Sequence, residues 1–133
     1  MAEYYKGQTA SYTKTVTDED VRAFAKVTGD ENPVHLNDAF AARSQFGARI
    51  AHGFLTGAMI SKILGMDFPG PGTVYLSQSM KFMAPAYIGD TLWASVTVTD
   101  YNEDKNRLTL LTEIHNQKAE LILTGEAVVM PPR

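Results

Sequence analysis

The chain has 133 residues, of which 44% are hydrophobic, so we expect residues 1–133 to form a single domain around one core. Its formal net charge of −3 at pH 7 argues against nonspecific binding of nucleic acid, and the absence of cysteine excludes disulfides and thiolate chemistry. There is no run of about 18 apolar residues and no apolar segment near the start, so the sequence predicts a cytoplasmic protein with neither a membrane span nor a secretory signal.

Short helices are expected in the first third of the chain. Residues 17–20 (Thr-Asp-Glu-Asp) have the spacing of a capping box, and apolar positions at helical spacing follow as far as Gly29, which is suited to end a helix. Asn37 can cap one or two further turns. Between these segments, Pro33 fixes its own φ and disfavours the α region for the preceding residue. We therefore expect residues 30–35 to be extended or turned rather than helical.

A longer helix is expected over residues 52–64, with Gly65 at its C-terminal end. It is apolar on nearly every face, which is typical of a buried helix. A chain of this size cannot build several helical layers, so another element must wrap this helix.

Period-two alternation of apolar residues predicts that strands supply the wrapping. The order is one weak strand, the helices and then four strands in a row, which suits an α+β layout with an antiparallel sheet curled around one central helix. The expected strands cover approximately residues 8–16, 74–82, 92–98, 108–114 and 121–129.

Asp30 and His35 form a candidate acid–base pair. Unperturbed Asp and His titrate near about 4 and 6.5, so at neutral pH one can hold a proton while the other accepts one. The alternative is that Asp30 only turns the chain and that His35 is a half-buried structural histidine. Spacing alone favours this second interpretation.

Two motifs change that balance: Gly29-Asp30-x-Asn32-Pro33-x-His35 and Ile50-Ala51-His52-Gly53, with Asp38, Ala41 and Phe46 between them. Together they resemble the MaoC-like hydratase family, and most closely its short (R)-specific enoyl-CoA hydratases, which feed polyhydroxyalkanoate synthesis. The resemblance covers nearly the whole chain. It implies the hotdog fold, a curved antiparallel sheet of about five strands wrapped around a long central helix, in agreement with the pattern above.

The resemblance implies reversible addition of water to a trans-2-enoyl-CoA, giving the (R)-3-hydroxyacyl-CoA, without a cofactor. Asp30 and His35 would share the reacting water, and which of them transfers which proton stays open. Gly53 would donate its backbone N–H to the thioester oxygen as an oxyanion hole, at a helix start where such groups are free. The alternative for Gly53 is that it only allows tight packing of the helix against the sheet.

Two residues are expected to support this pair. Asn32 would fix the loop through hydrogen bonds to the backbone. Ser61 is the polar exception on an apolar helix, and a buried hydroxyl needs a partner. Either it supports Asp30 or His35, or it bonds back to the carbonyl of residue 57. His52 is expected to be structural rather than the catalytic base.

Apolar side chains beside the helix would bind the acyl chain, although each is also suited to plain core packing; the candidates are Phe46, Leu55, Met59 and Tyr75. Basic side chains would bind the coenzyme A phosphates, with Arg43, Arg49, Lys62 and Lys81 as candidates. The three histidines are spread along the chain and predict no metal site.

The expected partners are an acyl-CoA thioester and a second copy of the chain, because a hotdog exposes one sheet edge and one face and its relatives cover them by forming a homodimer. Acyl sites would then lie at or near the subunit interface. Two alternatives stay open. The substrate thioester can be carried by an acyl carrier protein, with the enzyme acting as a 3-hydroxyacyl thioester dehydratase, or the chain can be a noncatalytic hotdog subunit that binds acyl thioesters.

Overall fold

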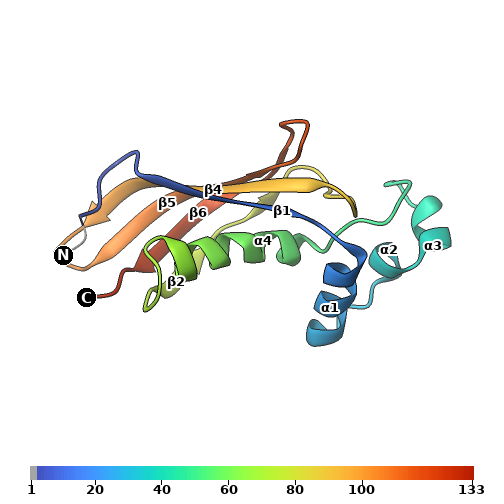
Figure 1. Cartoon of the computed structure of the whole chain (residues 1–133), viewed down its shortest axis with the longest axis horizontal. Coiled ribbons are helices and arrows are strands. Elements are labelled where there is room, and N and C mark those ends of the chain that lie inside the picture. Colours follow the sequence, from blue (N-terminus) through green and yellow to red (C-terminus); the bar gives the residue numbers. More distant parts are fainter. Residues whose placement is uncertain (1–2) are drawn as a thin grey trace.

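The structure, a computed structural model, describes residues 3–133 and contains a mixture of short helices and long strands (Figure 1). The helices are α1 (Asp18–Thr28), α2 (Pro33–Leu36), α3 (Asp38–Ala42) and α4 (Gly53–Lys62), which continues into a wider turn, η1 (Ile63–Asp67). The strands are β1 (Thr9–Thr15), β2 (Val74–Gln78), β3 (Lys81–Phe82), β4 (Thr91–Asn102), β5 (Arg107–His115) and β6 (Leu121–Met130).

The strands form one antiparallel sheet in the order β1-β4-β5-β6-β2, and β3 pairs with β6 beside β2. The sheet curves over α4, while α1, α2 and α3 gather beyond one end of it (Figure 1). The expected α+β layout, a curved antiparallel sheet around a central helix, is confirmed. The sheet has six strands instead of about five, because the segment expected as one strand over residues 74–82 is broken in two.

The break in that segment lies opposite Gly125 of β6. The Ser79 N–H donates to the Glu126 carbonyl (2.9 Å), and the Glu126 N–H donates back to the Ser79 hydroxyl (2.9 Å). A Cβ atom at residue 125 would lie 1.8 Å from the carbonyl oxygen of Ser79. Glycine is therefore required where the connection between β2 and β3 presses against β6.

The core lies between the inner face of the sheet and one face of α4. Alternate residues of β4 and β5, such as Leu92 and Leu110, are fully buried in the same hydrophobic cluster as Ile60 of the helix. Two expectations for this helix are wrong. It does not end at Gly65, because η1 carries the chain on to Asp67, and it is not buried all round, because Phe54 is 66% exposed.

The helices before α4 follow from their caps. Thr17 and Asp20 form the expected capping box of α1, and Gly29 ends this helix with φ +82°. The expectation that residues 30–35 are not helical is wrong for the last part, since α2 begins at Pro33. Proline is well suited to the first position of a helix, and Asn32, held outside the α region, caps it by accepting from the Val34 N–H (3.1 Å).

The two ends of the described chain lie far from α1–α3 (Figure 1). Near the start, the ring of Tyr4 packs against Tyr101 and Phe68. Near the C-terminus, the Asn106 side chain donates to the Pro131 carbonyl (2.8 Å). These contacts hold both ends at the β4–β5 turn. Within residues 3–133, no helix is long and apolar enough to cross a membrane.

Candidate active site

The structure brings Asp30, His35 and His52 together at the N-terminal end of α4. A carboxylate oxygen of Asp30 and a ring nitrogen of each histidine lie within 4.8 Å of one another. Both histidines are buried, whereas Asp30 is exposed in this chain. One water can hydrogen-bond to a carboxylate and an imidazole at such a separation, so the pair can share a water molecule.

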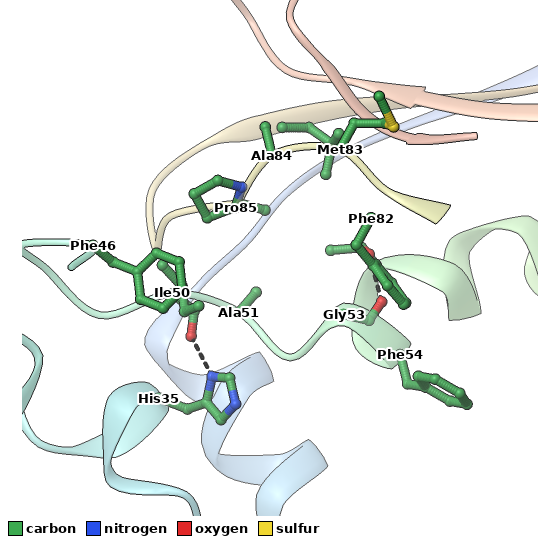
Figure 2. Close-up of a pocket in the computed structure, with 13 residues that line it drawn as sticks. His35, Phe46, Ile50, Ala51, Gly53, Phe54, Phe82, Met83, Ala84 and Pro85 are labelled. Atoms are coloured by element: carbon green, nitrogen blue, oxygen red, sulfur yellow. Dashed lines mark hydrogen bonds between the residues drawn. The ribbon is translucent and has the colours of Figure 1, made fainter. Parts of the chain in front are cut away.

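A hydrogen bond to a backbone carbonyl holds neutral His35 in one tautomer. Its Nδ1 atom lies 2.7 Å from the carbonyl oxygen of Ile50, and a carbonyl can only accept (Figure 2). The proton of neutral His35 therefore sits on Nδ1, which leaves Nε2 with a free lone pair. Burial lowers the pKa of His35 below its usual value, against the hydrogen bond to Ile50 and the charge of Asp30, which raise it. His35 is thus prepared to act as a base.

Arg49 anchors the backbone of His35. The Nε–H of Arg49 donates to the His35 carbonyl (2.7 Å), and its other nitrogens pair with the carboxylates of Asp18 and Asp38. The Arg49 side chain is only 10% exposed. The hydrogen bonds from Arg49 and Arg22 lower the pKa of Asp18. One guanidinium therefore ties α1 and α3 to the residue that carries the candidate base.

His35 lines an apolar cavity of about 470 Å³. Figure 2 shows the loop from Met83 to Pro85 on the wall opposite His35, with Phe82 beside Gly53. The lining is almost entirely apolar, and its members are His35, Phe46, Ile50, Ala51, Gly53, Phe54, Thr56, Phe82, Met83, Ala84, Pro85, Ala86 and Ile122. Such a cavity is suited to an acyl chain with its reacting end near the imidazole.

Gly53 is the first residue of α4 and also lines the cavity. The first N–H groups of a helix have no acceptor within the helix, and the helix dipole favours negative charge there. A Cβ atom on Gly53 would lie 2.6 Å from Cε1 of Phe82. The geometry thus suits both the oxyanion-hole role and the packing role expected for this glycine.

The other residues expected at the site are dispersed. Of the four acyl-chain candidates, Phe46 lines the cavity, whereas Leu55, Met59 and Tyr75 do not. Met59 is buried in the core, and Leu55 is partly buried against it. Tyr75 lies on β2 at the edge of the sheet, 39% exposed.

The expectation that the Ser61 hydroxyl is buried is wrong. Its side chain is exposed, on the same face of α4 as Phe54 and Ala58. Among the described residues, its hydroxyl makes no hydrogen bond to residue 57, Asp30 or His35. The apolar sequence of α4 suggested burial because a sequence pattern cannot show that one face of the helix is left uncovered within the chain.

The sequence of the chain matches the MaoC-like domain model over residues 3–119. The chain belongs to the MaoC-like domain family. It is 43% identical to an (R)-specific enoyl-CoA hydratase of Rhodospirillum rubrum, over 96% of this chain and 88% of that protein. It is also 34% identical to a mitochondrial 3-hydroxyacyl-[acyl-carrier-protein] dehydratase of Arabidopsis thaliana, over 95% of this chain and 76% of that protein.

Among solved structures, this MaoC-like chain is similar to the (R)-hydratase from Aeromonas caviae involved in PHA biosynthesis. The TM-score is 0.96 and the identity 42%, with 99% of this chain and 100% of that chain covered. The MaoC-like assignment and the hotdog fold expected from the two sequence motifs are therefore confirmed.

Two features of this MaoC-like site were missed in the sequence. The histidines are not all spread apart, since the rings of His35 and His52 stack with centroids 3.8 Å apart and planes 27° apart. A metal ion lies near the plane of an imidazole that binds it, so two stacked rings do not direct their lone pairs at one ion.

Arg49 and Lys62, considered for phosphate binding, form ion pairs with Asp18 and Asp67.

The cavity wall formed by Met83 to Ala86 was also missed. This loop lies about fifty positions from the catalytic motif in the sequence, and no hydrophobic periodicity marks it. It reaches the site because Ala51 donates its N–H to the Ala86 carbonyl (2.7 Å) and Met83 donates to Ile122 of β6 (2.8 Å). Backbone pairing of this kind leaves no signal in side-chain patterns.

Proposed function

We propose that this chain is an (R)-specific enoyl-CoA hydratase, which reversibly adds water to trans-2-enoyl-CoA to give (R)-3-hydroxyacyl-CoA. One observation carries the proposal: His35 and Gly53 at the N-terminus of α4 line one apolar cavity, and a carboxylate oxygen of Asp30 lies within 4.8 Å of a ring nitrogen of His35. Because this substrate class is intracellular, we also propose that the enzyme works in the cytoplasm.

In the hydration direction, a water molecule held between Asp30 and His35 attacks C3 of the enoyl group. His35 Nε2 takes the proton that this water loses as its oxygen adds to C3. The Asp30 carboxylate, which also binds the water, accepts a proton from the imidazolium of His35 and passes it to C2, so that both groups return to their starting protonation states and act as one acid–base unit. Negative charge develops on the thioester oxygen when the water oxygen adds to C3, before C2 is protonated, and the Gly53 N–H stabilises this charge. No cofactor is required for this chemistry.

The direct test is the loss of absorbance of the conjugated thioester when purified protein is mixed with crotonyl-CoA. Asp30→Asn and His35→Ala should each lower the rate by about 10²- to 10⁴-fold, because each removes one acid–base group. Val27→Ala, at an 81% exposed position on α1, serves as a control that should retain the rate. Full activity in both site variants would contradict the assignment.

The similarity to an acyl-carrier-protein dehydratase favours a second candidate, a dehydratase acting on carrier-protein thioesters. The reacting end of the substrate is the same in both cases, so the Asp30 and His35 chemistry does not distinguish them. Rates on crotonyl-CoA and on crotonyl-carrier protein, measured side by side, decide between the two. A higher kcat/KM for the coenzyme A thioester is expected.

We also propose that the chain works as a homodimer joined at the β2 edge. Within residues 3–133, β2 pairs on one side only, with β6. The adjoining surface is apolar, with Leu76 at 42%, Phe82 at 48% and Phe54 at 66% exposure. An unpaired edge next to such a surface favours association with a second copy, which would also cover the exposed face of α4 and Ser61.

Sedimentation of the purified protein tests the dimer. Leu76→Lys should shift the mass toward that of one chain, because it places a charge on the proposed interface. Leu111→Lys is a matched control, since Leu111 is equally exposed (40%) but lies on β5 in the middle of the sheet. A wild-type mass equal to one chain would contradict the proposal.

A further inference from the structure

His52 contacts Asp30 and His35 and directly precedes Gly53, but it does not line the substrate cavity. It is 2% exposed and is the residue before α4, where its carbonyl accepts from the N–H groups of Leu55 (3.1 Å) and Thr56 (3.3 Å). Its backbone therefore belongs to the helix start that carries Gly53. Its side chain, in contrast, reaches back across the chain to the loop of Asp30.

That side chain makes one hydrogen bond and two ring contacts. His52 Nε2 lies 2.9 Å from the carbonyl oxygen of Asp30. One face of the ring stacks on His35 at 3.8 Å between centroids, and the ring of Phe24 in α1 lies 4.8 Å away. The imidazole thus fits between the helix that supports the catalytic loop and the ring of the candidate base.

We propose that His52 is a positioning residue for the hydration reaction. It holds the Asp30 loop and the His35 ring in place relative to the N–H of Gly53. This inference rests on the proposed function. His52 takes no proton from the substrate or the water. It acts through Asp30 and His35, which contact the reacting atoms.

The hydrogen bond determines which proton His52 carries. Since the Asp30 carbonyl can only accept, His52 must donate from Nε2, and in the neutral ring this leaves Nδ1 unprotonated. His52 Nδ1 is buried and has no hydrogen-bond partner within residues 3–133. A proton on this nitrogen would have no acceptor among these residues.

The charges around the His35 ring also bear on the role of His52. The groups that face the His35 ring are the Asp30 carboxylate and the His52 ring, and the Arg49 guanidinium binds the His35 carbonyl. A second positive charge stacked on His35 would oppose the imidazolium that forms when His35 accepts a proton. In their neutral forms, the carbonyl partners of the two rings give opposite tautomers, with the proton on Nδ1 of His35 and on Nε2 of His52.

Two substitutions separate the hydrogen bond from the packing of the ring. His52→Phe keeps an aromatic ring but removes the donor, and His52→Gln keeps an N–H donor near the position of Nε2 but removes the ring. If positioning depends on the bond to Asp30, His52→Phe should lower kcat on crotonyl-CoA by roughly 10- to 100-fold with little change in KM, the loss expected from a small displacement of reacting groups. His52→Gln should restore most of kcat.

The matched control is His115→Phe. His115 is half-buried, packs against Trp93, and also has a buried Nδ1 without a partner in the described part of the chain, but it lies on β5 outside the site. Its kcat should equal that of the wild type. Thermal unfolding of all three variants gives the folded fraction, so that each rate is expressed per folded enzyme.

A second measurement needs no variant. ¹⁵N spectra of histidine-labelled wild-type protein distinguish the two tautomers of a neutral ring, and we expect the Nε2–H form for His52 and the Nδ1–H form for His35. An Nδ1–H tautomer or a charged ring for His52 near pH 7 would overturn the proposal, even if His52→Phe does not fold.

The remaining outcomes are also decisive. A folded His52→Phe with the wild-type kcat, or equal losses in His52→Phe and His52→Gln, would assign His52 to packing alone and overturn its positioning role. Failure of the proposed function is recognised separately, because wild-type protein would then not hydrate crotonyl-CoA or its carrier-protein analogue, whatever the tautomer of His52.

Discussion

The Nδ1 atom of His35 lies 2.7 Å from the carbonyl oxygen of Ile50, so the basic nitrogen of this residue is Nε2. Burial lowers the pKa of His35. Because only neutral His35 can accept a proton from water, we predict that kcat/KM for hydration falls on the acid side with a midpoint below about 6.5, the ordinary value for histidine. A pH series on crotonyl-CoA measures this midpoint, and a value above 6.5 would contradict the role of burial.

The same shift predicts how stability depends on pH. Between the unfolded pKa of about 6.5 and the lower folded pKa, the unfolded chain binds more protons at His35 than the folded chain does. The contribution of neutral, buried His35 to stability is therefore complete above pH 6.5 and is lost as the pH falls through this window. Urea unfolding at several pH values should show this slope, and His35→Gln should reduce it.

Arg49→Lys should lower the stability of the folded protein although the positive charge is kept. Lysine cannot reproduce the Nε bond to the His35 carbonyl together with the bonds to Asp18 and Asp38. Loss of a charged hydrogen bond to a half-buried carbonyl should lower the free energy of unfolding by about 1–3 kcal/mol and also lower kcat. Asp18→Asn is the control and should cost less, because Asp18 is half exposed. Equal effects in urea unfolding would show that Arg49 acts only through Asp18.

Gly53→Ala distinguishes the two interpretations of this glycine. The added Cβ would lie 2.6 Å from the Phe82 ring, so the single variant should lose both stability and rate. In the double variant with Phe82→Leu, the clash is relieved and stability should return. If the glycine also makes room for the thioester oxygen, kcat stays low in the double variant, whereas full recovery of kcat would reduce Gly53 to a packing residue.

Gly125→Ala should be strongly destabilising, because its Cβ would lie 1.8 Å from the carbonyl oxygen of Ser79 and the backbone would have to move. Overpacking of this kind costs about 1–3 kcal/mol or more, measured as the free energy of unfolding in urea. Gly65→Ala is the matched control. A Cβ there meets no atom within 4 Å, so the change should be neutral or slightly stabilising. Similar effects at both positions would contradict the close approach.

Much of the fold could be predicted from the sequence because the local preferences of the residues agree with the overall structure. The capping box at Thr17, the stop at Gly29 and the alternation along β4 and β5 each act over a few residues, and all were confirmed. The helical state of α2 was missed because proline was read as excluding a helix, whereas at the first position it favours one.

The parts that could not be predicted depend on distant contacts. The exposure of Phe54 and Ser61 depends on which face of α4 the sheet covers, and the hydrophobic pattern of α4 is nearly the same on all sides. The stack of His52 on His35 joins residues seventeen positions apart in the sequence, and only their relation in space shows that they form one unit.

The contacts of Tyr4 with Tyr101, and of Asn106 with Pro131, hold the two ends of the chain at the β4–β5 turn, away from the N-terminal end of α4 (Figure 1). An affinity tag, a fluorescent reporter or another enzyme can therefore be fused at either end at a distance from His35 and Gly53. The same placement makes the chain suitable for immobilisation through either end, with the attachment point away from the reaction site.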